Sequence, residues 1–243
     1  MKLADSLLNG VLLVDKSPDM TSHDVVAVAR RCLNTKKIGH CGTLDPMATG
    51  MLILVIGNGT KLQDLLMSED KEYTGSLRLG ATTSTQDREG EILEEKPVPE
   101  FSDADITAAF DAYRGDFHQM PPMVSAIKIN GVPLYKLARK GIEVERKPRF
   151  VRVYDYEIQK TAVPDIDFRV VCSKGFYVRT YAHDIGQKLG CGAHLTSLRR
   201  TRSGHFKFNP GQFTTFDALK EGRREEVMSS MLSLYDVSKL RGA

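Results

Sequence analysis

A glycine-rich segment from Gly39 to Gly50 holds the first residue that could do chemistry. It contains three glycines and one proline in twelve residues, and glycines let a loop approach a ligand closely. Asp45 lies in this segment and is the only acidic residue between Asp24 and Asp64. A lone carboxylate on such a loop could act as a nucleophile or a general base. It could also simply organise a turn before the proline that follows it.

A second candidate segment runs from Cys172 to Thr180 and passes from a predicted strand into a predicted helix. Lys174 and Arg179 could hold phosphates or pair with a buried carboxylate. Tyr177 could stack on a nucleic-acid base. The alternative interpretation is an ordinary junction between a strand and a helix, with a lysine and an arginine on its surface.

The metal-binding and cofactor-binding classes have no support in the sequence. Four cysteines form no Cys-x-x-Cys pair, and six histidines show no spacing typical of a metal site. The Gly-rich signatures of dinucleotide and nucleotide binding are missing, so we expect neither a metal nor a cofactor. His40, in the glycine-rich segment, could contact a substrate phosphate or stabilise the loop.

Charge is distributed unevenly along the chain, although the net charge is only +3. Residues 87–116 hold ten acidic and three basic side chains, whereas residues 188–207 hold five basic side chains and no acidic one. Such a distribution could give a basic face that holds a polyanion. It is also common on ordinary solvated surfaces.

Composition places the chain among globular proteins rather than membrane or secreted ones. It is 41% hydrophobic and 27% charged over 243 residues, and no apolar run approaches the roughly 20 residues of a membrane span. The N-terminus does not resemble a signal peptide. We therefore expect a cytoplasmic protein with reduced thiols and no membrane partner.

The elements that must position these residues mix strands and helices. Apolar runs and alternation predict strands at 11–14, 52–56, 72–79, 150–158 and 166–172. Helices are predicted after Thr21 or Ser22, after Ser102 with Asp105, over 177–189, and in the tail 214–243. The stretch from Ile38 to Gly50 is predicted as a loop. Because the order shows no strict strand–helix rhythm, we predict one α+β domain over residues 1–243, built on a mixed sheet.

Several ordered blocks resemble the bacterial tRNA pseudouridine-55 synthases, the TruB family. The glycine-rich segment is similar to the family's Gly-His-Thr-Gly-Thr-Leu-Asp-Pro loop. The other similar blocks, in chain order, are Gly10–Ser22, Lys71–Gly80, Thr83–Gly90, Pro121–Tyr135, Ser173–Thr180 and Gly190–Arg200. The resemblance covers residues 10–205 and implies the pseudouridine synthase catalytic fold, with a mostly antiparallel mixed sheet flanked by helices and loops. It also implies no separate C-terminal RNA-binding domain here.

The resemblance assigns roles to individual residues. Asp45 falls on the catalytic aspartate, Tyr73 on the tyrosine that stacks on the target base, and Arg179 on the arginine that pairs with the catalytic carboxylate. The positions that line or wedge the substrate site are His40, Tyr177 and Leu198, and Lys16 falls on a basic position near the active site. The implied reaction converts the T-loop uridine of tRNA to pseudouridine, without metal or cofactor, in a monomer bound to the T-arm.

Four positions depart from the family pattern without removing its central residues. The first turn reads Lys16-Ser17-Pro18-Asp19-Met20, and Cys41, Ser84 and Val124 replace the usual Thr, Asp and Tyr.

The Asp45 carboxylate could add to the sugar, add to the base or remove a sugar proton, and the sequence does not distinguish these three routes. Two alternative functions are a tRNA-binding folding factor on the same fold and a uridine isomerase that acts on another RNA.

Overall fold

The computed structural model describes residues 8–129 and 131–242, which divide into two compact units. In the described part, the first unit holds residues 8–71 and 199–242, and the second holds the residues from Glu72 to Leu198. The chain therefore leaves the first unit once and returns to it once. Within these described ranges no helix is both long and apolar enough to cross a membrane.

Strands of the first unit are centred on β3. They are β1 (Gly10–Lys16), β2 (Ile38–Cys41), β3 (Thr49–Ile56), the end of β12 (Ala193–Ser203), β13 (Phe206–Lys207) and β14 (Thr214–Thr215). β1 and β2 pair antiparallel with β3, while β12 runs parallel to β3. β1 and β3 are apolar and buried along almost their whole length, as expected of strands covered on both faces.

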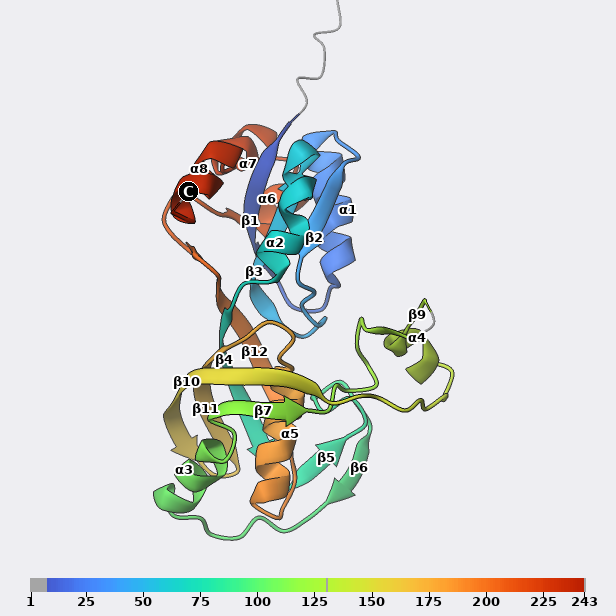
Figure 1. Ribbon diagram of the computed structural model, residues 1–243, viewed down its shortest axis with the longest axis vertical. Helices are drawn as coiled ribbons and strands as arrows, with labels where there is room; N and C mark the ends of the chain where they lie inside the picture. The colour runs from blue at the N-terminus through green and yellow to red at the C-terminus, as the bar shows by residue number, and fades with distance from the viewer. Residues whose placement is uncertain (1–7, 130, 243) are drawn as a thin grey trace, which may run out of the picture. The chain divides into compact units, whose positions relative to one another are not determined.

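Helices cover the strands of the first unit (Figure 1). They are α1 (Ser22–Leu33), the 3₁₀ helix η1 (Gly57–Leu62), α2 (Gln63–Met67), α6 (Phe216–Lys220), α7 (Arg224–Ser229) and α8 (Leu234–Leu240). α1 begins where Thr21 and Asp24 form a reciprocal capping box, which satisfies backbone N–H groups at the helix start. The helix buries Val25, Val26 and Ala29, so its amphipathic face helps to position the chain that follows.

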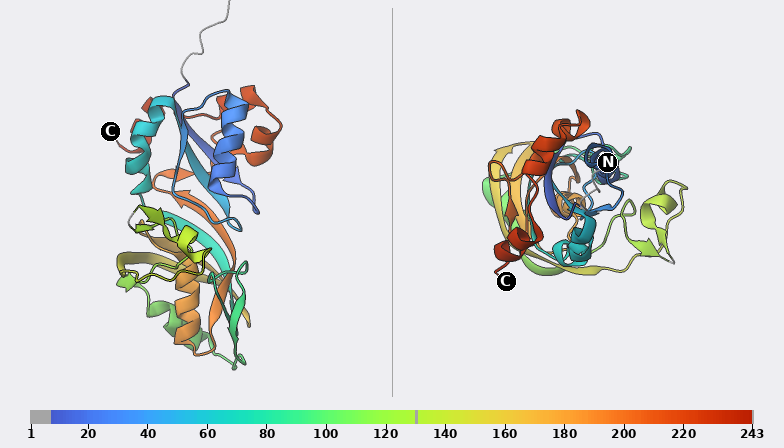
Figure 2. Two further views of the ribbon diagram at one scale, coloured as in Figure 1. Left: turned by 90° about the vertical axis from the view of Figure 1, so that its right-hand side faces the viewer. Right: turned by 90° about the horizontal axis from the view of Figure 1, so that it is seen from above.

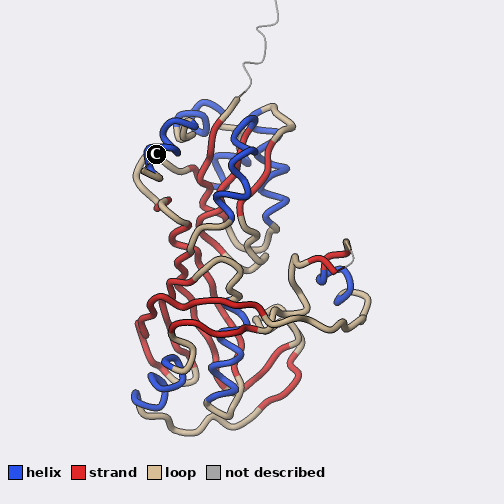
Figure 3. The backbone as a smooth tube through the Cα atoms, viewed as in Figure 1, coloured by secondary structure: helices blue, strands red, loops and turns tan. Residues whose placement is uncertain are grey.

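The second unit has a sheet in the order β12-β4-β11-β10-β7. Its strands are β4 (Lys71–Leu79), β5 (Ala81–Thr83), β6 (Ile92–Glu95), β7 (Gly115–Gln119), β8 (Lys128–Ile129), β9 (Val132–Pro133), β10 (Arg149–Ala162) and β11 (Asp165–Cys172). Its helices are α3 (Asp103–Asp111), α4 (Leu134–Ala138) and α5 (Val178–Lys188). The segment that carries α4 projects from the sheet of this unit, and Figure 3 shows that most of it is loop.

Aromatic side chains fill the core between this sheet and its helices. Phe110 of α3, Phe168 of β11 and Tyr181 of α5 make edge-to-face contacts with centroids 5.7 to 6.0 Å apart. Figure 2 shows α5 running alongside the strands. Alternate residues of β4 and β11 are buried, so each strand presents one face to this core.

The predicted α+β class and the capped helices are confirmed, but the loop prediction for Ile38–Gly50 is wrong at both ends. Residues Ile38–Cys41 form β2, and β3 begins at Thr49. Ile38 and Cys41 are buried against β3, so a long-range pairing overrides the local turn-like composition. The predicted helical tail contains α6, α7 and α8, preceded by the short strand β14.

Candidate active site

Asp45 lies on the loop that joins β2 to β3 in the first unit, and it is half-buried. The loop is tightly turned: the Ala48 N–H donates a hydrogen bond to the Asp45 carbonyl over 3.0 Å. Gly42 adopts a φ of +84°, in the left-handed region that favours glycine. Asp45 thus takes part in a tight turn through its backbone. Its role in the turn does not exclude a chemical role for its side-chain carboxylate.

Ser22 fixes the first half of this loop from the start of α1. Its buried hydroxyl accepts a hydrogen bond from the Leu44 N–H over 2.9 Å and donates to the Leu44 carbonyl over 3.2 Å. The Asp19 N–H donates to the Pro46 carbonyl over 3.0 Å. The residues on either side of Asp45 are thus held by polar contacts from elsewhere in the chain.

Lys16 fixes the second half of the loop from the end of β1. Its side chain is only 1% exposed. The ammonium donates to the carbonyls of Ser17 and Pro46, each over 3.0 Å, and to that of Ala48 over 2.6 Å. A buried ammonium requires such partners because leaving water is costly. The structure therefore places Lys16 beside the Asp45 loop, in contact with its backbone.

His40 lies on β2, half-buried in the same unit. Its Nδ1 is buried and has no hydrogen-bond partner among the described residues. Burial lowers the pKa of His40 to about 4, with smaller contributions from the nearby charges of His23 and Arg200. The rings of His40 and His23 meet edge to face with centroids 5.1 Å apart. At neutral pH the ring is therefore uncharged, so it can act as a neutral hydrogen-bonding group but not as a cation.

Arg179 lies in the first turn of α5 in the second unit, and it is 3% exposed. Its Nη1 donates to the Thr85 carbonyl over 2.8 Å, and its Nη2 donates to the Val124 carbonyl over 2.7 Å. Its Nε is 3.6 Å from the Asp87 carboxylate, and both side chains are 4% exposed. This buried arginine is consequently held in one orientation.

Asp87 is a functional candidate that the sequence prediction missed. Its Oδ1 accepts hydrogen bonds from Thr85 Oγ1 over 2.5 Å and from the Glu89 N–H over 3.0 Å. In the sequence it appears as one member of a long acidic run. The available signal was its place in the Thr83–Gly90 block, which resembles a family motif.

Three further predicted site residues lie in the second unit with Arg179. Tyr73 points to the buried face of β4 and is 9% exposed, and Leu198 of β12 is 7% exposed. Tyr177 precedes α5, and its backbone forms two hydrogen bonds with the Gln119 amide, over 2.8 and 3.0 Å. The structure thus places Tyr73, Arg179, Tyr177 and Leu198 in the second unit, and Asp45, His40 and Lys16 in the first.

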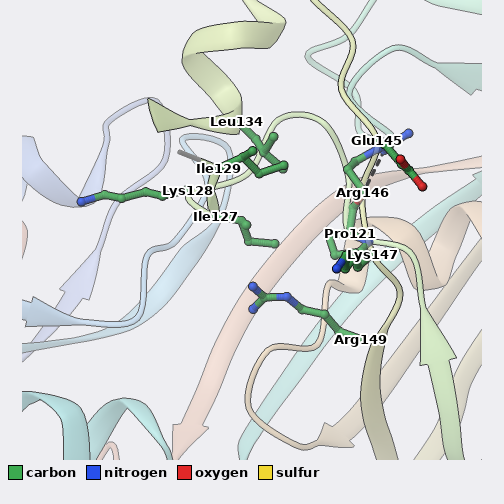
Figure 4. Close-up of a pocket in the computed structure, with 9 residues that line it drawn as sticks. All are labelled: Pro121, Ile127, Lys128, Ile129, Leu134, Glu145, Arg146, Lys147 and Arg149. Atoms are coloured by element: carbon green, nitrogen blue, oxygen red, sulfur yellow. Dashed lines mark hydrogen bonds between the residues drawn. The ribbon is translucent and has the colours of Figure 1, made fainter. Parts of the chain in front are cut away.

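A pocket of about 310 Å³ opens in the second unit, beside the segment that carries α4 (Figure 4). Apolar side chains line part of it: Pro121, Ile127, Ile129 and Leu134. Four cations and one carboxylate complete the lining: Lys128, Arg146, Lys147, Arg149 and Glu145. Lining of this kind suits an anion that also has an apolar part. The sequence analysis did not predict this pocket, because Lys128 lies far along the chain from Arg146, Lys147 and Arg149.

No group of three His, Cys, Asp or Glu side chains that could hold a metal occurs within residues 8–129 and 131–242. Residues 30–178 match the N-terminal domain of TruB family pseudouridylate synthases. Residues 179–236 match the C-terminal domain of tRNA pseudouridylate synthase B.

The chain belongs to the TruB family. It is 54% identical over 231 residues to the tRNA pseudouridine synthase B of Opitutus terrae, and the match covers 95% of each chain. It is 47% identical over 227 residues to the protein of that name from Syntrophotalea carbinolica, covering 93% of this chain and 74% of the relative. The resemblance drawn from the ordered motifs is confirmed.

Solved structures similar to this TruB family chain include a Cbf5–Nop10–Gar1 complex, with a TM-score of 0.74 and 29% identity. That match covers 96% of this chain and 63% of the solved one. An archaeal box H/ACA Nop10–Cbf5 complex matches with a TM-score of 0.69 and 28% identity, covering 95% and 61%. This chain thus spans less than two thirds of those solved chains. The predicted pseudouridine synthase fold is confirmed by these matches.

Proposed function

We propose that this protein is a tRNA pseudouridine synthase that isomerises the T-loop uridine at position 55. The observation that carries the proposal is the Asp45 loop, where one carboxylate sits on a turn fixed by the buried side chains of Ser22 and Lys16. Fixing a reactive group in advance is a main source of catalytic rate. The names of the 54% and 47% identical relatives support the same activity.

The reaction breaks the bond between uracil N1 and the sugar C1′ and forms a bond between uracil C5 and C1′. The proton on C5 leaves to solvent, and one proton is gained at N1. No net oxidation or reduction occurs, so the proposed reaction needs no redox cofactor. The Asp45 carboxylate would act by adding to the sugar, adding to the base, or removing a sugar proton, and each route needs its ionised form.

The second unit would supply the groups that hold the uridine. A base inside a folded RNA must leave its stack before it can react. We propose that Tyr73 stacks on the extruded uracil, that Tyr177 and Leu198 line its site, and that Arg179 supports the reacting carboxylate. The neutral His40 would contact the substrate as a hydrogen-bonding group. These roles are supported by the match of each residue to a family motif.

The RNA partner would be the T-arm of tRNA. The pocket next to α4 supports this proposal because Lys128, Arg146 and Lys147 could contact phosphates while Ile127 and Leu134 face a base. We further propose that the two units act as one catalytic domain, in a cytoplasmic monomer. A monomer would show the mass of a single chain, 27.1 kDa, in light scattering of the free protein.

The test locates the modified nucleotide. Unmodified tRNA and an isolated T-arm stem-loop are incubated with the protein, treated with a carbodiimide that labels pseudouridine, and copied by reverse transcriptase. We expect a single stop at position 55 in both RNAs. Stops only in other RNAs would favour the uridine isomerase with a different target. Tight tRNA binding with no stop anywhere would favour the folding factor.

A further inference from the structure

Arg200 is the largest side chain that the described part of the chain buries completely, with 1% exposure. The proposed reaction above gives it no role. Both interpretations of the basic run at residues 188–207, a face that holds a polyanion and a solvated surface, expect exposed side chains, and the structure corrects this for Arg200. An arginine remains charged in proteins, so its burial is costly unless its N–H groups are bonded.

The partners of Arg200 lie at the base of the loop that carries Asp45. The β2–β3 ladder ends with the pair Cys41 and Ile53. Just beyond it, Arg200 Nη2 donates to the Gly42 carbonyl over 3.1 Å, and Nε donates to the Met51 carbonyl over 2.6 Å. One guanidinium thus joins the two stems of the loop at the point where their own pairing stops.

Gly50 allows this arrangement. β12 pairs in parallel with β3 at Arg200 and Gly50, and Gly50 adopts a φ of +94°. A Cβ at Gly50 would lie 2.4 Å from the Arg200 carbonyl oxygen and 2.9 Å from its backbone nitrogen. The missing side chain therefore lets β12 approach β3 closely, so that the guanidinium reaches both stems.

The neighbouring Arg199 is also an arginine, but its side chain makes a different kind of contact. It makes two hydrogen bonds of 2.9 Å to the Asp15 carboxylate and is 41% exposed, as a surface ion pair usually is. The partners of Arg200 Nε and Nη2 are backbone carbonyls instead. Two directed bonds from a planar fork constrain a backbone more than one point charge could. The contacts of Arg200 thus constrain the shape of the loop.

We propose that Arg200 is a positioning residue, which holds Asp45 in its reactive geometry by joining Gly42 and Met51 across the base of the loop. This inference rests on the proposed function. It assigns Arg200 no contact with the uridine. Since a displacement of about 1 Å can cost about 10²-fold in rate, loosening the loop should slow the chemical step.

The test uses Arg200→Met and Arg200→Lys with tRNA carrying tritium at uracil C5, under single-turnover conditions. We expect Arg200→Met to lower the rate by about 10²-fold, with tRNA affinity unchanged within about threefold. Arg200→Lys should recover part of the rate, because an ammonium keeps the charge and can donate to one stem. Thermal unfolding sets an assay temperature at which each variant is folded. If Arg200→Met does not fold, Arg200→Gln replaces it.

Arg30→Met is the control for removing an arginine that bonds a backbone carbonyl in the same unit. Arg30 is exposed, unlike Arg200, and its Nη2 donates to the Ile38 carbonyl over 2.8 Å at the start of β2, the end of that strand opposite to the Asp45 loop. We expect this variant to keep the wild-type rate. Equal losses in Arg30→Met and Arg200→Met, or an Arg200→Met loss that appears entirely in tRNA affinity, would overturn the proposal.

A second readout does not depend on activity. Hydrogen exchange in the peptide spanning residues 42–51 should accelerate in Arg200→Met and stay unchanged in Arg30→Met, because the Ala48 N–H is bonded within the loop. Unchanged exchange in Arg200→Met would contradict the positioning role. A wild-type protein that releases no tritium would instead contradict the proposed function, while this exchange comparison would still decide whether Arg200 fixes the loop.

Discussion

The Nε of Arg179 lies 3.6 Å from the carboxylate of Asp87, and both side chains are 4% exposed. The Asp87 carboxylate is itself fixed by Thr85 and by the Glu89 N–H. Removing one partner from a buried ion pair is costly, because the remaining charge loses part of its compensation. Asp87 therefore helps to hold Arg179, together with the Thr85 and Val124 carbonyls.

Asp87→Asn should destabilise the protein and slow turnover. The expected loss in the free energy of unfolding is about 3–5 kcal/mol, because one partner of a buried pair becomes neutral. Urea unfolding measures this loss, and tritium release measures turnover. The control is Asp116→Asn, whose partner Arg152 is 3.5 Å away with both side chains about half exposed. Equal effects of the two substitutions would contradict a special role for Asp87.

Gly50→Ala should affect both stability and activity. Its φ of +94° disfavours a side chain, and the new Cβ would also meet the Arg200 backbone. Gly115→Ala is the matched control, because Gly115 has a φ of +81° with no atom near the added Cβ. Backbone strain alone costs roughly 1 kcal/mol. We expect Gly50→Ala to cost more than Gly115→Ala in urea unfolding, and only Gly50→Ala to slow tritium release.

The depressed pKa of His40, about 4 in the folded protein, predicts a pH dependence of stability. The unfolded chain binds a proton to this residue near its ordinary value of 6.5, whereas the folded protein does not. The contribution of neutral His40 to the free energy of unfolding is therefore fully present above pH 6.5, and it is lost as the pH falls toward 4. The steepest loss is about 1.4 kcal/mol per pH unit.

Replacing His40 by Gln removes this titration. Burial also lowers the pKa of His183, so that residue contributes a loss of the same sign. The comparison is therefore between wild type and His40→Gln, by urea unfolding at pH 7 and pH 5. We expect the variant to lose less stability between the two pH values than the wild type does. Parallel losses would show that His40 is not the responsible group.

Local signals predicted the parts of the fold that depend on local chemistry. The capping residues Thr21 and Ser102 marked the starts of α1 and α3, because an N-cap acts on its own first turn. The Asp45 loop was found because its glycines and its single acid stand out in the sequence. Ordered motifs then gave the family.

Long-range pairing explains what the sequence did not predict. The stretch Ile38–Cys41 includes Gly39 and His40, so its residue types do not predict a strand. It forms β2 because it pairs with β3. Asp87 and Arg200 resembled members of charged surface runs. Asp87 is buried against Arg179, which is 92 residues away along the chain. Arg200 is buried against Gly42, which is 158 residues away. No local pattern records such partners.

Tritium release shows whether Asp45 carries out the isomerisation of uridine. Transfer RNA labelled at uracil C5 is incubated with wild type and with Asp45→Asn, which keeps the shape of the side chain and removes its charge. We expect the wild type to release one tritium per tRNA and the variant none above background, with tRNA binding retained in both. Release by Asp45→Asn at the wild-type rate would show that this carboxylate is not required for the reaction.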